Sequence, residues 1–388
     1  MSIAPHRQVF ASFAIYAFCL GQLFTRLPSV KEAMGVGEGA LGLALIGASV
    51  GTMVALTLGS PVINRFGHKR VMIGALMAMP VFYAIAIHAP GPGMLFVLLL
   101  PAGVTLGLTE IIVNVEADRT EARMGRRIMN RAHAFWSFGF FGAGLFGAGM
   151  AQAGVPPALH MALVIPLAWG ALWLLLRNFE PAPKRGTDSS TEAPMIARPT
   201  LPILALVGVS ISAMVLEGGS LDWSAIYMLE SFDTAPVFGG LAVATVALSQ
   251  ALVRYRADRL IDRFQPVPVA RAMQAAMALG VVFVFFAPAP LVALLGFALI
   301  GGGTATLFPL AISAAAQRTD RPAALNVAAL AQFSFVAFLL GPPLLGYIAE
   351  HAGLHWVWGI SLPLIALSLA LSSRLAPAAE EPSPASSG

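Results

Sequence analysis

Apolar stretches of about 20 residues, separated by short polar segments, run through almost the whole chain. A helix of that length crosses the ~30 Å hydrocarbon core of a bilayer and satisfies its backbone hydrogen bonds internally. The stretches lack the alternating ten-residue pattern of a membrane barrel. The pattern therefore predicts an all-α membrane protein with twelve transmembrane helices, at residues 9–27, 39–62, 70–88, 94–117, 130–152, 157–177, 201–228, 236–256, 268–287, 290–314, 324–347 and 354–375.

One polar interruption is much longer than the others. Residues 178–199 are rich in Pro, Ser, Thr and charged residues, a composition that cannot bury a core. The last residues, 376–388, have a similar composition. We therefore expect two pseudo-symmetric six-helix bundles, at 1–177 and 200–375, joined by a cytoplasmic linker and followed by a disordered cytoplasmic tail.

The charge distribution predicts the orientation in the membrane. Hydrophobic residues make up 57% of the chain and charged residues 11%, whereas about a quarter of an ordinary soluble domain is charged. With a cytoplasmic N-terminus, every Lys and Arg except Arg26 and Lys31 falls on the inner side of the twelve spans. We therefore predict a multi-pass protein of the bacterial inner membrane with both termini cytoplasmic. The basic pI of about 9.6 then requires no nucleic-acid partner.

The two halves carry related segments. Residues 59–67 and 257–265 each follow the second span of their half, and Asn-Arg-Phe at 64–66 corresponds to Asp-Arg-Phe at 262–264. A parallel duplication of six spans, with the segment 59–70 after the second, resembles the major facilitator superfamily and its signature loop between helices 2 and 3. The first position of the Asn-Arg-Phe triplet is usually Asp in that signature.

The fourth and fifth spans resemble one branch of that superfamily. The segments 107–114 and 130–139 are similar to those of fucose-permease-type sugar/proton symporters. The resemblance implies a proton-handling Glu at Glu110 and polar cavity residues at His133 and Trp136. Symporters of this type also have an acidic residue near the outer end of helix 1, where this chain has none.

Two acidic residues within predicted spans are candidates for proton coupling. Glu110 shares a helical face with Asn114 in the fourth span, and Glu217 lies beside a Gly-Gly pair in the seventh. A charged side chain at bilayer depth costs about 2.5–3.5 kcal/mol, so it normally faces a cavity or a partner. Such a carboxylate can take up a proton on one side and release it on the other. The alternative is a structural carboxylate paired with a buried donor.

Further polar side chains within the spans are candidates for a solute cavity. A tryptophan offers a sugar both an apolar face and an N–H donor. Trp136 and Gln332 occupy corresponding positions of the repeat. Ordinary packing is the alternative interpretation of Trp136 and His133. The candidate cavity residues are Gln22, Asn114, His133, Trp136 and Gln332.

Two charged residues near the outer ends of the first and seventh spans are candidates for a periplasmic gate. Arg26 and Asp222 lie in helices that the repeat relates to each other, so the two side chains can pair across the outer mouth. In the alternative interpretation, Arg26 extends to the lipid headgroups and pairs with no residue of the second half.

Charged residues at the inner rims predict cytoplasmic latches, which hold the inside closed and break on switching. In the alternative interpretation these charges are solvated, and their pairs contribute less than ~1 kcal/mol. In the first half, Arg65 and Arg70 can meet Glu116 or Asp118 when the protein opens outward. In the second half, Arg259 and Arg263 can meet Asp320.

These features predict a secondary active transporter. The chain has no nucleotide-binding motif, no catalytic triad setting and no metal-ligand motif, so we expect neither an enzyme nor a cofactor or metal. The first hypothesis is a proton-coupled symporter of a small polar solute such as a sugar. A proton-driven exporter of small organic molecules and a non-transporting membrane sensor or scaffold are the alternatives. The expected partners are the solute, protons and the lipid bilayer, and the expected state is a monomer.

Overall fold

The computed structural model describes residues 3–183 and 197–376, and within them twelve helical segments are long and apolar enough to span a membrane. This finding confirms the predicted all-α fold and its twelve spans. Residues 184–196 of the predicted linker and 377–388 of the predicted tail lie outside the described residues.

Each half contributes six of these spans. Three of the twelve spans are divided into shorter helices. The first half consists of α1 (Pro5–Phe24), α2 (Leu27–Met34), α3 (Glu38–Phe66), α4 (His68–Ala86), α5 (Pro92–Met124), α6 (Met129–Gln152) and α7 (Pro157–Leu176). The second half consists of α8 (Leu201–Ser231), α9 (Val237–Phe264), α10 (Pro266–Phe285), α11 (Pro290–Thr304), α12 (Leu307–Ala316), α13 (Ala323–Ala352), α14 (Trp356–Gly359), α15 (Ser361–Leu371) and the 3-10 helix η1 (Ser372–Leu375).

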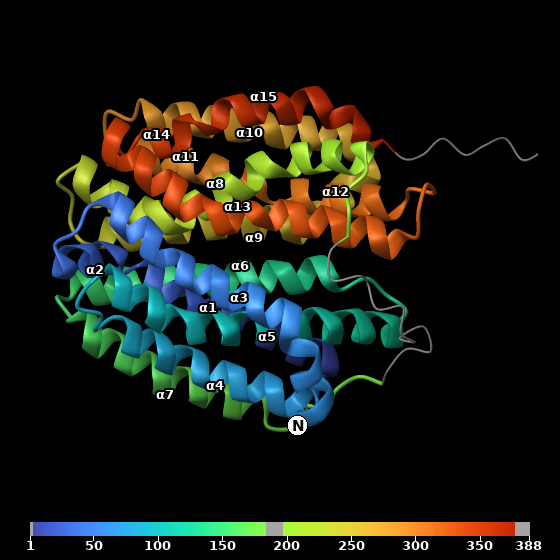
Figure 1. Ribbon diagram of the computed structural model, residues 1–388, viewed down its shortest axis with the longest axis horizontal. Helices are drawn as coiled ribbons and strands as arrows, with labels where there is room; N and C mark the ends of the chain where they lie inside the picture. Colours follow the sequence, from blue (N-terminus) through green and yellow to red (C-terminus); the bar gives the residue numbers. More distant parts are fainter. Residues whose placement is uncertain (1–2, 184–196, 377–388) are drawn as a thin grey trace, which may run out of the picture.

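The two halves form bundles that lie side by side, α1–α7 below and α8–η1 above in Figure 1. The N-terminus and the described flanks of the linker lie at one end of the molecule, which we call the terminal end. The helix α2 lies at the other end, which we call the opposite end, where it contacts the last turn of α8.

The first and tenth spans are broken near a proline. The break between α1 and α2 falls at Thr25 and Arg26, just before Pro28, and the break between α11 and α12 falls just before Pro309. Proline has no backbone N–H and cannot bond to the carbonyl four residues earlier. The Ala305 carbonyl therefore receives no hydrogen bond from residue 309 and can accept one from another helix.

The halves meet where α6 packs along α9 and α3 packs against α13. Two glycines make the first contact possible, since a Cβ on Gly144 would lie 2.6 Å from the Ala244 backbone N and one on Gly240 would lie 2.6 Å from the Ala148 backbone N. The two contacts are reciprocal, each pairing a glycine on one helix with an alanine on the other. Small residues of this kind let membrane helices approach closely.

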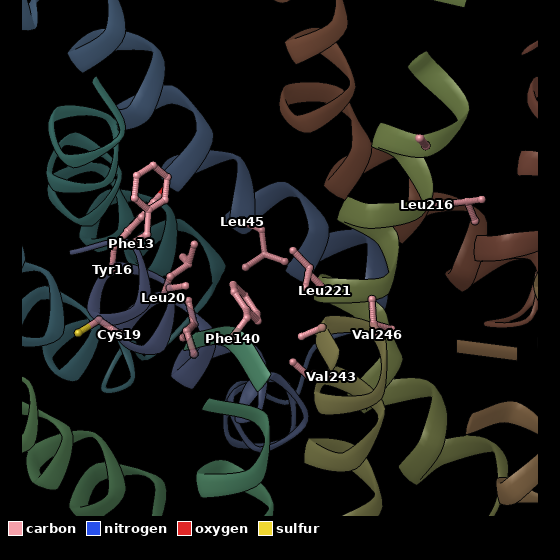
Figure 2. Close-up of a cluster of buried hydrophobic side chains, with 14 of the residues drawn as sticks. Phe13, Tyr16, Cys19, Leu20, Leu45, Phe140, Leu216, Leu221, Val243 and Val246 are labelled. Atoms are coloured by element: carbon pink, nitrogen blue, oxygen red, sulfur yellow. The ribbon is translucent and has the colours of Figure 1, made fainter. Parts of the chain in front are cut away.

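Apolar side chains from both halves fill the interface near the middle of the bundle. Figure 2 shows Leu20, Leu45 and Phe140 of the first half gathered near Leu221 and Val243 of the second. All five belong to one buried cluster. These side chains exclude water from the interface and support the polar site described next.

Candidate functional site

A central polar site begins on α5 and α1. Glu110 and Asn114 lie one turn apart on α5, and Asn114 Nδ2 donates to Glu110 Oε1 at 2.9 Å and to the Glu110 backbone O at 2.8 Å. The Tyr16 side chain of α1 lies close to the Glu110 carboxylate. Glu110 is half-buried, so the Asn114 donor replaces part of its lost hydration.

The helix α6 adds His133 and Trp136 to the same site. His133 Nε2 donates to Asn114 Oδ1 at 3.2 Å, and the Trp136 and Tyr16 ring centroids are 6.4 Å apart. The sequence pattern placed Glu110 and Asn114 on one helical face, and the fold brings this pair together with His133, Trp136 and Tyr16. Their assigned roles remain predictions.

Arg254, on α9 of the second half, reaches this site across the interface between the halves. Its Nη2 lies 3.3 Å from Glu217 Oε1 on α8, and its Nη1 donates to Ser137 Oγ on α6 at 3.1 Å. Its Cζ lies 6.0 Å from the centroid of the Trp136 ring. The guanidinium therefore joins a carboxylate of its own half to α6 of the other half.

The break in the tenth span helps to hold Arg254 in place. Arg254 Nε donates at 3.3 Å to the Ala305 carbonyl, the group to which Pro309 cannot donate. The side chains of Arg254 and Glu217 retain only 13% and 15% of their exposure. Charge-assisted hydrogen bonds in such a setting are stronger than neutral ones and fix the guanidinium in one orientation.

Gln250 lies one turn from Arg254 on α9 and contacts the same Ser137 hydroxyl of α6. Ser137 Oγ donates to Gln250 Oε1 at 3.0 Å, and Gln250 Nε2 donates to Thr304 Oγ1 at 3.4 Å. In the sequence, Arg254 was counted only with the basic residues on the inner side of the spans, and Gln250 was not selected. The signal was present, because a Gln and an Arg one turn apart occupy one face of an otherwise apolar span.

Two predicted cavity residues lie outside this central group. Gln22 Oε1 accepts a hydrogen bond from His160 Nε2 at 2.8 Å, within the buried core of the first half. Gln332 Oε1 accepts a hydrogen bond from the Ala197 backbone N–H at 3.0 Å, on the described flank of the linker. The helical pattern placed both residues within spans but could not show these local partners.

The predicted pair between Arg26 and Asp222 is not formed in this structure. Arg26 Nε donates to His160 Nδ1 at 2.7 Å, and its Nη2 donates to the Val155 carbonyl at 3.0 Å. Both partners belong to the first half, so the Arg26 guanidinium makes these hydrogen bonds without contacting the second half.

Other charged residues join the halves at the opposite end. Lys31 Nζ lies 2.6 Å from Glu38 Oε1 and 2.7 Å from Glu230 Oε1, so it links α2 and α3 to the last turn of α8. Glu350 Oε2, near the end of α13, accepts a hydrogen bond from the Gly39 N–H at 3.0 Å at the start of α3. Sequence reasoning noted Lys31 as one of two outer basic residues but did not identify these partners.

The predicted latch acids have partners near them in the chain or within their own half. Glu116 accepts from His68 Nδ1 at 2.6 Å and from the Ala182 N–H at 2.8 Å, and Arg119 Nη1 lies 3.7 Å from it. Arg65 lies over the Phe66 ring, with its Cζ 5.5 Å from the centroid. Glu116 therefore contacts His68 rather than Arg65 in this conformation.

The second-half latch is likewise not formed here. Asp320 pairs with Arg318 at 3.2 Å and accepts from Asn326 Nδ2 at 3.1 Å, while Arg263 lies over the Phe264 ring. Partial loss of hydration raises the pKa of Asp320, but the Asn326 hydrogen bond and the Arg318 charge outweigh it and leave that pKa below its usual value. The first-half latch was predicted for a conformation that is open to the outside. Pairing of Arg65 or Arg70 with Glu116 or Asp118, and of Arg259 or Arg263 with Asp320, remains a prediction.

Comparison with known proteins agrees with this architecture. The sequence profile of the Major Facilitator Superfamily matches residues 9–221 and again 207–388. An uncharacterised transporter of Sinorhizobium fredii is 27% identical over 377 residues, which cover 97% of this chain and 98% of the relative.

Solved transporters share the fold at low sequence identity. The nucleoside transporter NupG superposes with a TM-score of 0.70 at 13% identity, covering 96% of this chain and 99% of NupG. A variant of the fucose:proton symporter FucP of E. coli superposes with a TM-score of 0.58 at 15% identity, covering 97% of this chain and 99% of FucP. These likenesses concern the fold, whereas the profile covers nearly the whole sequence. The chain belongs to the Major Facilitator Superfamily and is a membrane transporter rather than an enzyme.

Proposed function

We propose that this transporter works by alternating access and couples the movement of a small, neutral, polar solute such as a sugar to protons. The observation that carries the proposal is the central site, where Arg254 of the second half lies against Glu217 and Ser137 while Glu110 of the first half is bound to Asn114. Carboxylates at this depth normally serve transport or pairing.

The contacts between the halves support alternating access. The links of Lys31 to Glu230 and of Glu350 to Gly39 hold the opposite end together. At the terminal end, α5 and α12 pack on helices of their own halves, while α6 stays in contact with α9, where Asn130 donates to Asp258. We propose that the terminal end is cytoplasmic, because nearly all basic residues fall there, and that this conformation is the one closed to the periplasm.

The balance of charge in the site supports a neutral solute. Arg254 is already paired with Glu217, and the Glu110 carboxylate accepts a hydrogen bond from the uncharged Asn114 amide. A charged solute would have to displace one of these partners, whereas a polyhydroxylated solute can exchange hydrogen bonds with Asn114 and His133 and stack on Trp136. Nucleosides and fucose, named for two fold relatives, are solutes of this kind.

Coupling through Glu110 requires that its carboxylate bind and release a proton as access alternates. Glu110→Gln imitates the permanently protonated form and keeps a hydrogen-bonding group beside Asn114. We expect the variant to bind and exchange solute but not to concentrate it. Its inside-to-outside ratio should fall to about one under a pH gradient, because a carrier without coupling only equilibrates its solute.

The test begins with a thermal-shift panel of monosaccharides, polyols and nucleosides on the purified protein, since a bound ligand stabilises the folded state. The solute with the largest shift is then radiolabelled for uptake and counterflow in proteoliposomes. Glu121→Gln, a change at a carboxylate that accepts from the Ile128 and Met129 N–H groups at the terminal end of α5, is the matched control. Wild-type accumulation by Glu110→Gln would remove Glu110 as the coupling residue.

A further inference from the structure

Asp222 lies on α8 between the central site and the closed opposite end. It is five residues beyond Glu217, or about 7.5 Å along the helix axis. Its neighbour Trp223 packs where α13 meets α3, because a Cβ on Gly346 would lie 3.1 Å from Trp223 Cζ2 and 2.6 Å from the Glu38 carbonyl. This level of α8 is therefore part of the interface that must separate when the opposite end opens.

Asp222 differs from the other acidic residues of the spans in its surroundings. It is 8% exposed, and it makes no hydrogen bond or ion pair within residues 3–183 and 197–376. By contrast, Glu110 accepts from Asn114, and Glu217 pairs with Arg254.

The charged and titratable groups on the elements around this part of α8 are engaged elsewhere. Among the basic side chains, Lys31 binds Glu38 and Glu230, Arg26 binds His160, and Arg254 binds Glu217. Among the others, Glu350 accepts a hydrogen bond from the Gly39 N–H, His351 bonds to the Tyr347 carbonyl, and Tyr227 donates to the Val284 carbonyl. The His355 ring packs on Phe285. None of the basic side chains in this group is thus left to compensate Asp222 as an anion.

The next two side chains of α8 are also without protein partners. Trp223 Nε1 and Ser224 Oγ are buried and make no hydrogen bond to the described residues. A buried polar group without a partner costs free energy. Three consecutive residues of this kind lie where the two halves touch. Such an arrangement is expected if these side chains acquire hydrogen-bond partners in another conformation.

We propose that Asp222 is a second proton-binding site, which holds a proton while the opposite end is closed and exchanges it with the compartment at that end when α3 and α13 separate. An isolated carboxylate in an apolar interface is far less costly as the neutral acid than as the anion. A metal cation is a poorer occupant, because Na⁺-like or Ca²⁺-like ions need several oxygen ligands and the described residues hold no cluster of three or more acidic, His or Cys side chains.

The inference rests on the proposed proton-coupled function and extends it. Glu217 precedes Gly218-Gly219 on α8 and lies one to two turns from Asp222, which follows the glycine pair. Glu217 and Arg254 form the second-half part of the central site. A proton taken up at Asp222 would thus enter near that pair from the opposite end, while Glu110 exchanges its proton at the central site.

The direct test is difference infrared spectroscopy of the protein in lipid nanodiscs at neutral pH. The wild-type-minus-Asp222→Asn spectrum should contain the carbonyl stretch of one protonated carboxyl group. The same difference for the matched control Asp233→Asn, at an exposed loop carboxylate, should contain only ionised carboxylate bands. Ionised carboxylate bands in the Asp222 difference, or bands that change when Na⁺ replaces choline, would overturn the proposal.

A second measurement uses the wild-type chain and so does not depend on folding of the variant. Dicyclohexylcarbodiimide modifies protonated carboxyl groups in apolar surroundings, and peptide mass spectrometry locates the product. We expect modification of Asp222, and no modification at Asp222 under conditions that label other sites would contradict the proposal. Both measurements report protonation without a solute, so they remain informative even if solute-driven proton movement is not found.

Discussion

Replacement of Arg254 by Gln is expected to abolish concentrative transport and to destabilise the protein by about 3 kcal/mol, because removal of one partner of a buried ion pair leaves the other uncompensated. Glu217, with 15% of its side chain exposed, would lose the cationic partner that it has among the described residues. The Ser137 hydroxyl and the Ala305 carbonyl would also lose a donor.

The controls separate lost charge pairing from lost structure. Arg256→Gln changes an exposed arginine two positions away on α9 and should retain wild-type stability and transport. The double variant Arg254→Gln/Glu217→Gln removes both charges and should recover most of the thermal stability but not the transport. Denaturation in detergent and solute uptake measure the two effects. Normal uptake by Arg254→Gln would show that the central site is not built around this arginine.

Reversal of the charge at Lys31 is expected to open the opposite end. Lys31→Glu would place three carboxylates together, because Lys31 Nζ lies 2.6 Å from Glu38 and 2.7 Å from Glu230. Glu230 retains 40% exposure, so solvent screens the pair and the lost attraction is about 1 kcal/mol, with repulsion added to it. Such an energy changes the ratio of the two conformations at least about fivefold.

Spin labels on the opposite-end loops measure that change. Labels at His88→Cys and Pro288→Cys report the separation of the two halves, and the native Cys19 is buried away from the reagent. Lys31→Glu should populate a longer distance, and the reciprocal variant Lys31→Glu/Glu230→Lys should restore the shorter one. Glu32→Gln, at an exposed neighbour of Lys31, is the matched control. An unchanged distance distribution in Lys31→Glu would mean that Lys31 does not hold this end closed.

The fold was predictable from the sequence because each span is an autonomous apolar helix. Hydropathy placed twelve spans correctly and the helical face of α5 correctly joined Glu110 to Asn114. The helix ends were less certain, since α5 continues to Met124 beyond the predicted residue 117. Hydropathy detects the apolar segment in the membrane but not the polar turns that extend beyond it.

The partners of the charged residues could not be predicted in the same way. The symmetry of the repeat favoured a pair between Arg26 and Asp222, but His160 and Val155 satisfy Arg26 within its own half. Arg254 was counted only with the basic residues on the inner side of the membrane, because hydropathy does not resolve the depth of an arginine near a helix end. Its position depends on a carbonyl that Pro309 frees in another helix, a tertiary effect without a local sequence pattern.

We predict that solute and protons move together through this transporter. The most direct measurement is of internal pH in proteoliposomes loaded with pyranine, after addition of the solute identified by the thermal-shift panel. Wild-type protein should acidify the lumen as solute enters, and Glu110→Gln should exchange solute with no change of internal pH. Solute entry through the wild-type protein without a pH change, or with alkalinisation of the lumen, would contradict proton symport.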